Sequence, residues 1–132
     1  MNMKNFVLGG IAGGITDFLL GWLFYGIVFF DYFGGQEPNM AFITAGCFSF
    51  GFLMSYILIG LAGISGFGKG ARAGLGIGIL TGLMSNFFSR GMSGDVNWEH
   101  FGVDLIICLI IGALVGGVVG AVNGKLSKTA TA

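Results

Sequence analysis

Charged residues are scarce in this sequence: its 132 residues include six basic and six acidic side chains, 9% of the total. Soluble domains carry about a quarter of their residues as Asp, Glu, Lys or Arg, so these side chains are too few to cover a surface exposed to water. The net charge is zero, which gives no electrostatic attraction for nucleic acid. The composition therefore argues against an ordinary soluble domain and against a nucleic-acid-binding protein.

Residues that build catalytic and metal sites are equally scarce. His100 is the single histidine, and Cys47 and Cys108 lie in separate apolar stretches without a CxxC pattern. No histidine stands beside a nucleophile, no two carboxylates share one predicted depth, and no phosphate-binding loop is present. We therefore expect no enzyme, no cofactor and no metal site.

Hydrophobic residues are abundant instead, at 55% with a mean hydropathy of +0.90. They gather in four stretches at about 6–30, 41–64, 73–88 and 103–122. Each is near the ~20 residues that a helix needs to cross ~30 Å of hydrocarbon, and four strands would be too few to close a barrel. The sequence predicts an all-α integral membrane protein, a four-transmembrane-helix bundle forming one domain over 1–132, with a flexible tail at 124–132.

The basic residues are distributed unevenly between the predicted connections. One side of the membrane receives Lys4, Lys69, Arg72, Lys125 and Lys128. Arg90 alone falls on the other side. Because positively charged loops stay in the cytoplasm, this bias predicts that both termini are cytoplasmic (N-in, C-in).

Glycine is the commonest residue, at 27, and it recurs every four residues on three of the predicted helices. The rows are Gly9, Gly13, Asp17 and Gly21; Gly70, Gly74, Gly78 and Gly82; and Gly112, Gly116, Gly120 and Gly124. In lipid, small residues at this spacing let helix backbones approach closely and gain dispersion contacts. The rows either pack the four helices of this chain together or, on the last helix, form a homodimer interface.

Asp17 is the candidate functional residue. It lies about eleven residues into the first predicted helix, roughly 16 Å deep, where an ionised carboxylate costs ~3 kcal/mol. Four hydroxyl side chains could hydrogen-bond it: Thr16, Ser55, Thr81 and Ser85. Three roles stay open for Asp17: a proton or cation site, a contact with a partner subunit, or a protonated acid that ties two helices together.

Polar and aromatic residues mark the end of the molecule opposite the basic side. Arg90 and Asp104 flank the same predicted loop, which favours an ion pair at the membrane interface. Trp98 fits an aromatic belt at that interface. His100 lies in the same loop beside Glu99, and two such neighbours are too few ligands for a metal.

Two segments resemble a known family. The runs LLGWLFYGIVF, from Leu19 to Phe29, and IIGALVGGVVG, from Ile110 to Gly120, are similar to the DUF1761 family of small bacterial four-helix membrane proteins. The resemblance implies a fold and a compartment, the bacterial cytoplasmic (inner) membrane, and no particular chemistry.

Two functions follow as expectations. The first is a non-enzymatic subunit, either a homo-oligomer or an accessory part of a larger membrane complex, with the lipid bilayer as its surroundings. The alternative is a small proton-coupled transporter or ion channel that uses Asp17. Small multidrug exporters resemble this chain in having four helices and one acid midway along the first. The polar residues are few and lie mostly in the half away from the basic side, which favours the first function.

Overall fold

The computed structural model describes residues 3–28, 40–94 and 98–131, and every secondary-structure element within them is helical. The first two helices each end in a π-helical segment. The elements in order are α1 (Met3–Gly21), η1 (Trp22–Val28), α2 (Met40–Ser55), η2 (Tyr56–Leu61), α3 (Phe67–Ser93) and α4 (Trp98–Thr131). The all-α prediction is confirmed for this part of the chain.

Three of the described helices are long and apolar enough to cross a membrane. These spans are Met3–Phe24, Met40–Leu61 and Trp98–Leu126. Helix α3 has 27 residues, about 40 Å at 1.5 Å per residue, so its length would also suffice. Its glycines, hydroxyl side chains and basic residues give it a lower mean hydropathy. Three helices therefore support the interpretation of this chain as a membrane protein. That α3 forms a fourth membrane span stays a prediction.

Several predicted helix boundaries are wrong. Helix α3 extends six residues earlier and five later than the predicted 73–88, and α4 begins at Trp98 rather than at Val103. The tail expected to be flexible from Gly124 is helical as far as Thr131. No proline interrupts it, and basic residues near a helix C-terminus interact favourably with the helix dipole. Residues 29–30, the predicted end of the first helix, lie outside the described residues.

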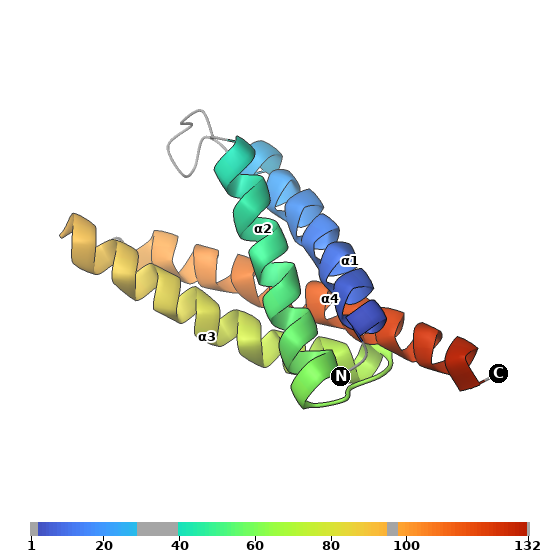
Figure 1. The fold of residues 1–132 in the computed structure, drawn as a ribbon. Helices are drawn as coiled ribbons and strands as arrows, with labels where there is room; N and C mark the ends of the chain where they lie inside the picture. The colour runs from blue at the N-terminus through green and yellow to red at the C-terminus, as the bar shows by residue number, and fades with distance from the viewer. Residues whose placement is uncertain (1–2, 29–39, 95–97, 132) are drawn as a thin grey trace.

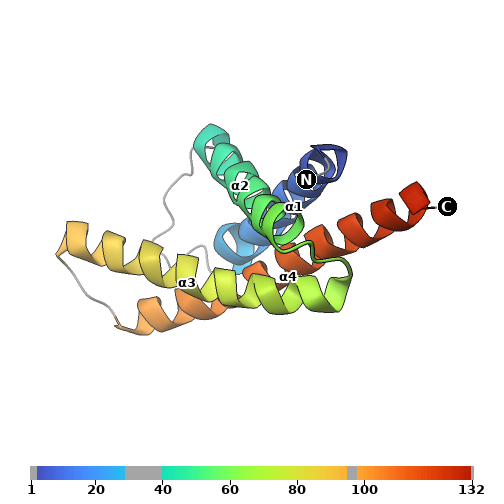
Figure 2. The same ribbon diagram turned by 60° about the horizontal axis from the view of Figure 1, so that its bottom comes forward.

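The four helices form two antiparallel hairpins that cross obliquely. Figure 1 shows α1 beside α2 and α3 beside α4, with the two hairpins leaving their crossing in different directions, and Figure 2 shows the same crossing after a turn of 60°. The main contact between the hairpins is α1 against α4. The chain is thus a helix bundle with one narrow junction between two long hairpins.

Backbone contact between glycines holds α3 against α4. A Cβ atom added at Gly116 would lie 2.6 Å from the Cα of Gly74, and one at Gly112 would lie 2.6 Å from the Cα of Gly78. Real Cβ atoms do not approach this closely, so the two helices can meet only where both lack a side chain. The glycine row of α4 is therefore packed against α3 of the same chain.

Helix α1 uses two neighbouring glycine pairs to pack against two helices. Gly10 and Gly14 contact the phenyl rings of Phe52 and Phe48 on α2. In the second pair, Gly13 meets α4, where a Cβ at Gly13 would lie 2.9 Å from a methyl group of Val119. Gly9 lies between η2 and α4, and a Cβ there would lie 2.7 Å from a methyl group of Ile59 and 3.6 Å from one of Val119. The i, i+4 spacing puts each pair on one helix face, so α1 packs against α2 and α4 at the same time.

The apolar core lies at the junction of the hairpins. Its buried residues come from α2, η2 and α4: Met54, Leu58, Ile59, Ile107, Ile111, Val115 and Val119. Few large side chains reach this core from α1, because the glycines of α1 let α4 come close. The junction is therefore set by glycine on one helix and branched aliphatic residues on the other.

Candidate functional site

Asp17 continues the helix face on which α1 meets α4. We call the antiparallel contact between α1 and α4 the α1–α4 seam. Along it, Gly9 lies against Val119, and Gly13 lies against Val115 and Val119. Asp17 is the next position on the same face, one turn beyond Gly13. There the hairpins begin to diverge, so the carboxyl group lies at the edge of the junction and not inside the close contact.

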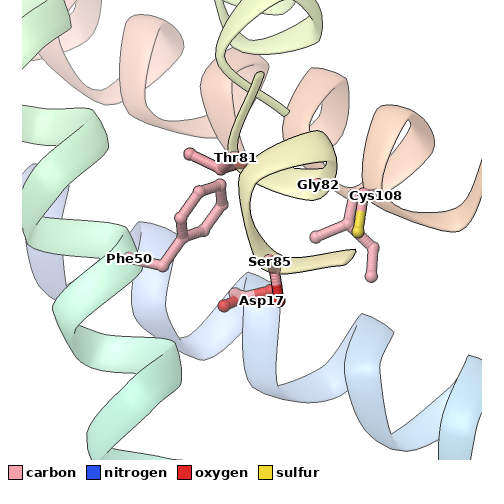
Figure 3. Close-up of a pocket in the computed structure, with 7 residues that line it drawn as sticks. Asp17, Phe50, Thr81, Gly82, Ser85 and Cys108 are labelled. Atoms are coloured by element: carbon pink, nitrogen blue, oxygen red, sulfur yellow. The ribbon is translucent and has the colours of Figure 1, made fainter. Parts of the chain in front are cut away.

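A cleft of about 240 Å³ opens at this point, and all four helices line it. Its walls are Asp17 of α1, Phe50 of α2, Thr81, Gly82 and Ser85 of α3, and Cys108 and Ile111 of α4. In Figure 3 the Asp17 side chain extends from α1 toward the turn of α3 that carries Ser85. The structure thus brings together one acid and two hydroxyl residues that are far apart in the sequence.

The sequence did not indicate that Cys47 of α2 is a neighbour of Asp17. The Cys47 thiol lies close enough to the partly buried Asp17 carboxyl to interact with it. Two of the expected partners are engaged elsewhere: the Thr16 hydroxyl donates to the Ala12 carbonyl at 2.8 Å, and the Ser55 hydroxyl donates to the Phe6 carbonyl at 2.7 Å. Asp17 therefore contacts α2 and faces α3.

The remaining predicted partners, Thr81 and Ser85, line the cleft. The Thr81 hydroxyl donates its proton to the Ile77 carbonyl at 2.8 Å, which leaves its oxygen lone pairs as acceptors toward the cleft. Ser85 is exposed at the rim. These two residues give the cleft a polar side on α3 opposite the Asp17 carboxyl.

Asp104 lies one helical turn from the cleft, on α4. The buried Asn86 amide donates to the Asp104 carboxylate at 2.5 Å and to the Gly82 carbonyl at 2.8 Å. The guanidinium carbon of Arg90 lies 6.0 Å from the centre of the Phe101 ring, within the range of a cation–π contact. The expected Arg90–Asp104 ion pair stays a prediction.

A second polar contact, which the sequence did not reveal, closes the other end of the α1–α4 seam. The Asn5 amide donates to the Asn123 side-chain oxygen at 2.8 Å, and the Asn123 amide donates to the Ile64 carbonyl at 2.8 Å. Both asparagines are buried. Asn5 stands four residues before Gly9, and Asn123 stands four residues after Val119. The pair therefore lies one helical turn beyond the Gly9–Val119 contact, and only knowledge of that contact could have indicated it.

The Asp17 carboxyl and the two hydroxyl groups of the cleft can take part in proton exchange, hydrogen bonding and weak cation binding. Among the described residues, no three His, Cys, Asp or Glu side chains are grouped so that they could hold a metal ion. A carboxyl group facing hydroxyl oxygens can exchange a proton or accept a hydrogen bond from a polar partner. Both roles match the alternatives that the sequence left open for Asp17.

Comparisons with protein-family models, characterised proteins and solved structures find no match for this chain.

Proposed function

We propose that this chain is a non-enzymatic subunit of a membrane assembly, in which a helix of a partner subunit fills the cleft at Asp17. In this proposal α3 spans the membrane together with the other three helices, and both termini lie in the cytoplasm of a bacterial cell. A copy of the chain itself and a different membrane protein are both possible partners. The resemblance to the DUF1761 family agrees with this compartment.

One observation carries the proposal: the carboxyl group lies in a cleft that residues 3–28, 40–94 and 98–131 leave open. Asp17 is partly buried and Ser85 at the rim is exposed, while the span of α1 runs from Met3 to Phe24. Asp17 is thus near mid-membrane, where leaving an ionised carboxylate in lipid costs ~3 kcal/mol. A partner helix that offers a hydrogen-bond donor would remove this cost and fill the gap between the diverging hairpins.

Blocking the rim of the cleft tests the proposal. We expect Ser85→Leu to reduce the large species on blue-native electrophoresis in mild detergent at least tenfold, because leucine occupies the space of the partner helix. Ser89→Leu is the matched control: it makes the same change at an exposed position of α3 that does not line the cleft. A wild-type chain that runs as a monomer, or a Ser85→Leu chain that keeps its assembly, would refute the proposal.

A second candidate is supported by the lining of the same cleft. Because all four helices contribute, and because Asp17 faces two hydroxyl residues of α3, a proton or small cation could bind between the hairpins. A small proton-coupled transporter or channel would use this arrangement, with Asp17 alternating between protonated and ionised states.

Replacing Asp17 by asparagine tests this candidate, since asparagine keeps hydrogen bonding but cannot ionise. If the chain moves protons, the wild type will dissipate a pH gradient across proteoliposomes, and Asp17→Asn will slow the dissipation at least tenfold. Asp104→Asn changes an acid outside the cleft lining and should leave the rate within about twofold. If proteoliposomes of the wild type hold the pH gradient for as long as empty vesicles do, the transport function is rejected. The assembly proposal is not affected by that result.

A further inference from the structure

The fold gathers basic residues from three helices at one end of the molecule. Lys4 lies in the first turn of α1, Lys69 and Arg72 lie in the first two turns of α3, and Lys125 lies near the end of α4. All four side chains are exposed. We call this group the basic end.

Hydrogen bonds between the helices fix these positions relative to one another. The Asn5–Asn123 pair joins the start of α1 to the end of α4, and Asn123 also binds the Ile64 carbonyl ahead of α3. The Gly66 amide donates to the Gly120 carbonyl at 2.8 Å, which holds the start of α3 on α4. The basic end is therefore a built feature of the fold and does not depend on loose chain ends.

The described acidic residues lie away from the basic end. Asp17 is in the middle of α1, and Glu99 and Asp104 are in the first turns of α4, at the opposite end of the α3–α4 hairpin. Within the described part of the chain, the basic end thus has four positive side chains and no acidic one. Its electrostatic field attracts anions.

Two of these cations, Lys4 and Lys125, lie at the ends of candidate membrane spans, where lipid headgroups are expected. The α1 span begins at Met3, the α2 span ends at Leu61, and the α4 span ends at Leu126. Lys4 and Lys125 are therefore within two residues of the end of a span. Lys69 and Arg72 stand eight and eleven residues after the α2 span, in the first two turns of α3, and their long side chains can extend to the same membrane surface. Being three residues apart, they lie on one face of α3.

We propose that the basic end binds the anionic headgroups of phospholipids in its own leaflet, with Lys69 and Arg72 as the principal contacts. Phosphate accepts hydrogen bonds from both side chains, and arginine can bind it through two parallel N–H groups. Each basic residue near an anionic membrane surface raises the affinity about fivefold. A lipid suits this surface better than a soluble polyanion because Lys4 and Lys125 lie at the ends of candidate membrane spans.

Native mass spectrometry after reconstitution with equal amounts of phosphatidylglycerol and phosphatidylcholine tests the proposal. The wild type is expected to retain phosphatidylglycerol preferentially. Removing two cations in the double variant Lys69→Gln/Arg72→Gln should lower this preference about thirtyfold. The charge-keeping double variant Lys69→Arg/Arg72→Lys should stay within about fivefold of the wild type, and Arg90→Gln, at the other end of α3, should change nothing.

The wild type provides a second measurement that needs no variant. Raising the salt from about 0.1 M to about 1 M shortens the Debye length from ~10 to ~3 Å, so the preference for phosphatidylglycerol should fall. Equal retention of the two lipids by the wild type, or a preference that neither salt nor the glutamine variant lowers, would overturn the proposal. Displacement of phosphatidylglycerol by soluble polyphosphate at equal phosphate concentration would show that the surface binds a soluble polyanion instead.

Discussion

Replacing Gly74 by alanine is expected to destabilise the α3–α4 hairpin by about 1–3 kcal/mol, the usual effect of adding a methyl group to a fully packed contact. The new Cβ would meet the backbone carbonyl of Gly112 and would lie 2.8 Å from the Cα of Gly116. Neither neighbour is the end of a flexible side chain, so the helices must move apart. Titration with SDS in mixed micelles, followed by circular dichroism, measures the loss.

Gly76 provides the matched control on the same helix. Nothing lies within 4 Å of a Cβ added there, so Gly76→Ala introduces the same methyl group without a clash. Because alanine favours helix over glycine by about 1 kcal/mol in water, this variant should be as stable as the wild type or more so. Equal destabilisation by the two substitutions would show that α3 and α4 do not meet through their glycines.

A leucine at Gly13 is expected to separate the two hairpins. A Cβ at this position already lies 2.9 Å from Val119 and 3.3 Å from the Cα of Gly51, and the rest of a leucine side chain has no space between them. Since α1 on α4 is the main contact between the hairpins, we expect a loss of about 3 kcal/mol or more. The crossing of the hairpins should become variable.

Spin labels on α1 and α4 can measure this separation directly. Ile11 and Ile106 are exposed positions on the two helices and are suitable sites for double electron–electron resonance. Gly13→Leu should lengthen and broaden the distance distribution by several ångströms, about the width of the added side chain. Gly21→Leu serves as the control, because a Cβ at Gly21 meets nothing within 4 Å. An unchanged distribution in the Gly13→Leu chain contradicts the described junction.

Some of the architecture could be predicted because it follows from local spacing. Apolar stretches predicted the helices, since a backbone in lipid must satisfy its own hydrogen bonds. Glycines at every fourth residue marked the faces where α3 meets α4, because that period keeps them on one side of a helix. These signals lie within one helix, and a sequence displays them directly.

The boundaries of α3 could not be predicted from hydropathy. Its first turns carry Lys69 and Arg72, and its last turns carry Asn86 and Arg90, so its apolar stretch is shorter than the helix. Contact with α4 along its length stabilises these polar turns, as tertiary packing usually does for helices. Helix α3 is thus longer than its apolar stretch because packing against α4 stabilises its polar ends.

The environment of Asp17 was predicted only in part. Its glycine row showed that it would face other helices, and Thr81 and Ser85 were expected near it. Cys47 was missed because a cysteine in an apolar stretch gives no sign of its neighbours. The Asn5–Asn123 pair was missed for a similar reason, since its members are 118 positions apart and only the crossing of the hairpins brings them together.

The helices of this chain are expected to be surrounded by lipid, and one fractionation measures this directly. Membranes from cells that express the chain are washed with carbonate at high pH, and the pellet is then extracted with or without detergent. We predict that the chain stays in the pellet through the wash and becomes soluble only with detergent, because three of its helices have the length and hydropathy of membrane spans. A chain released by the wash and monodisperse in aqueous buffer would contradict the account.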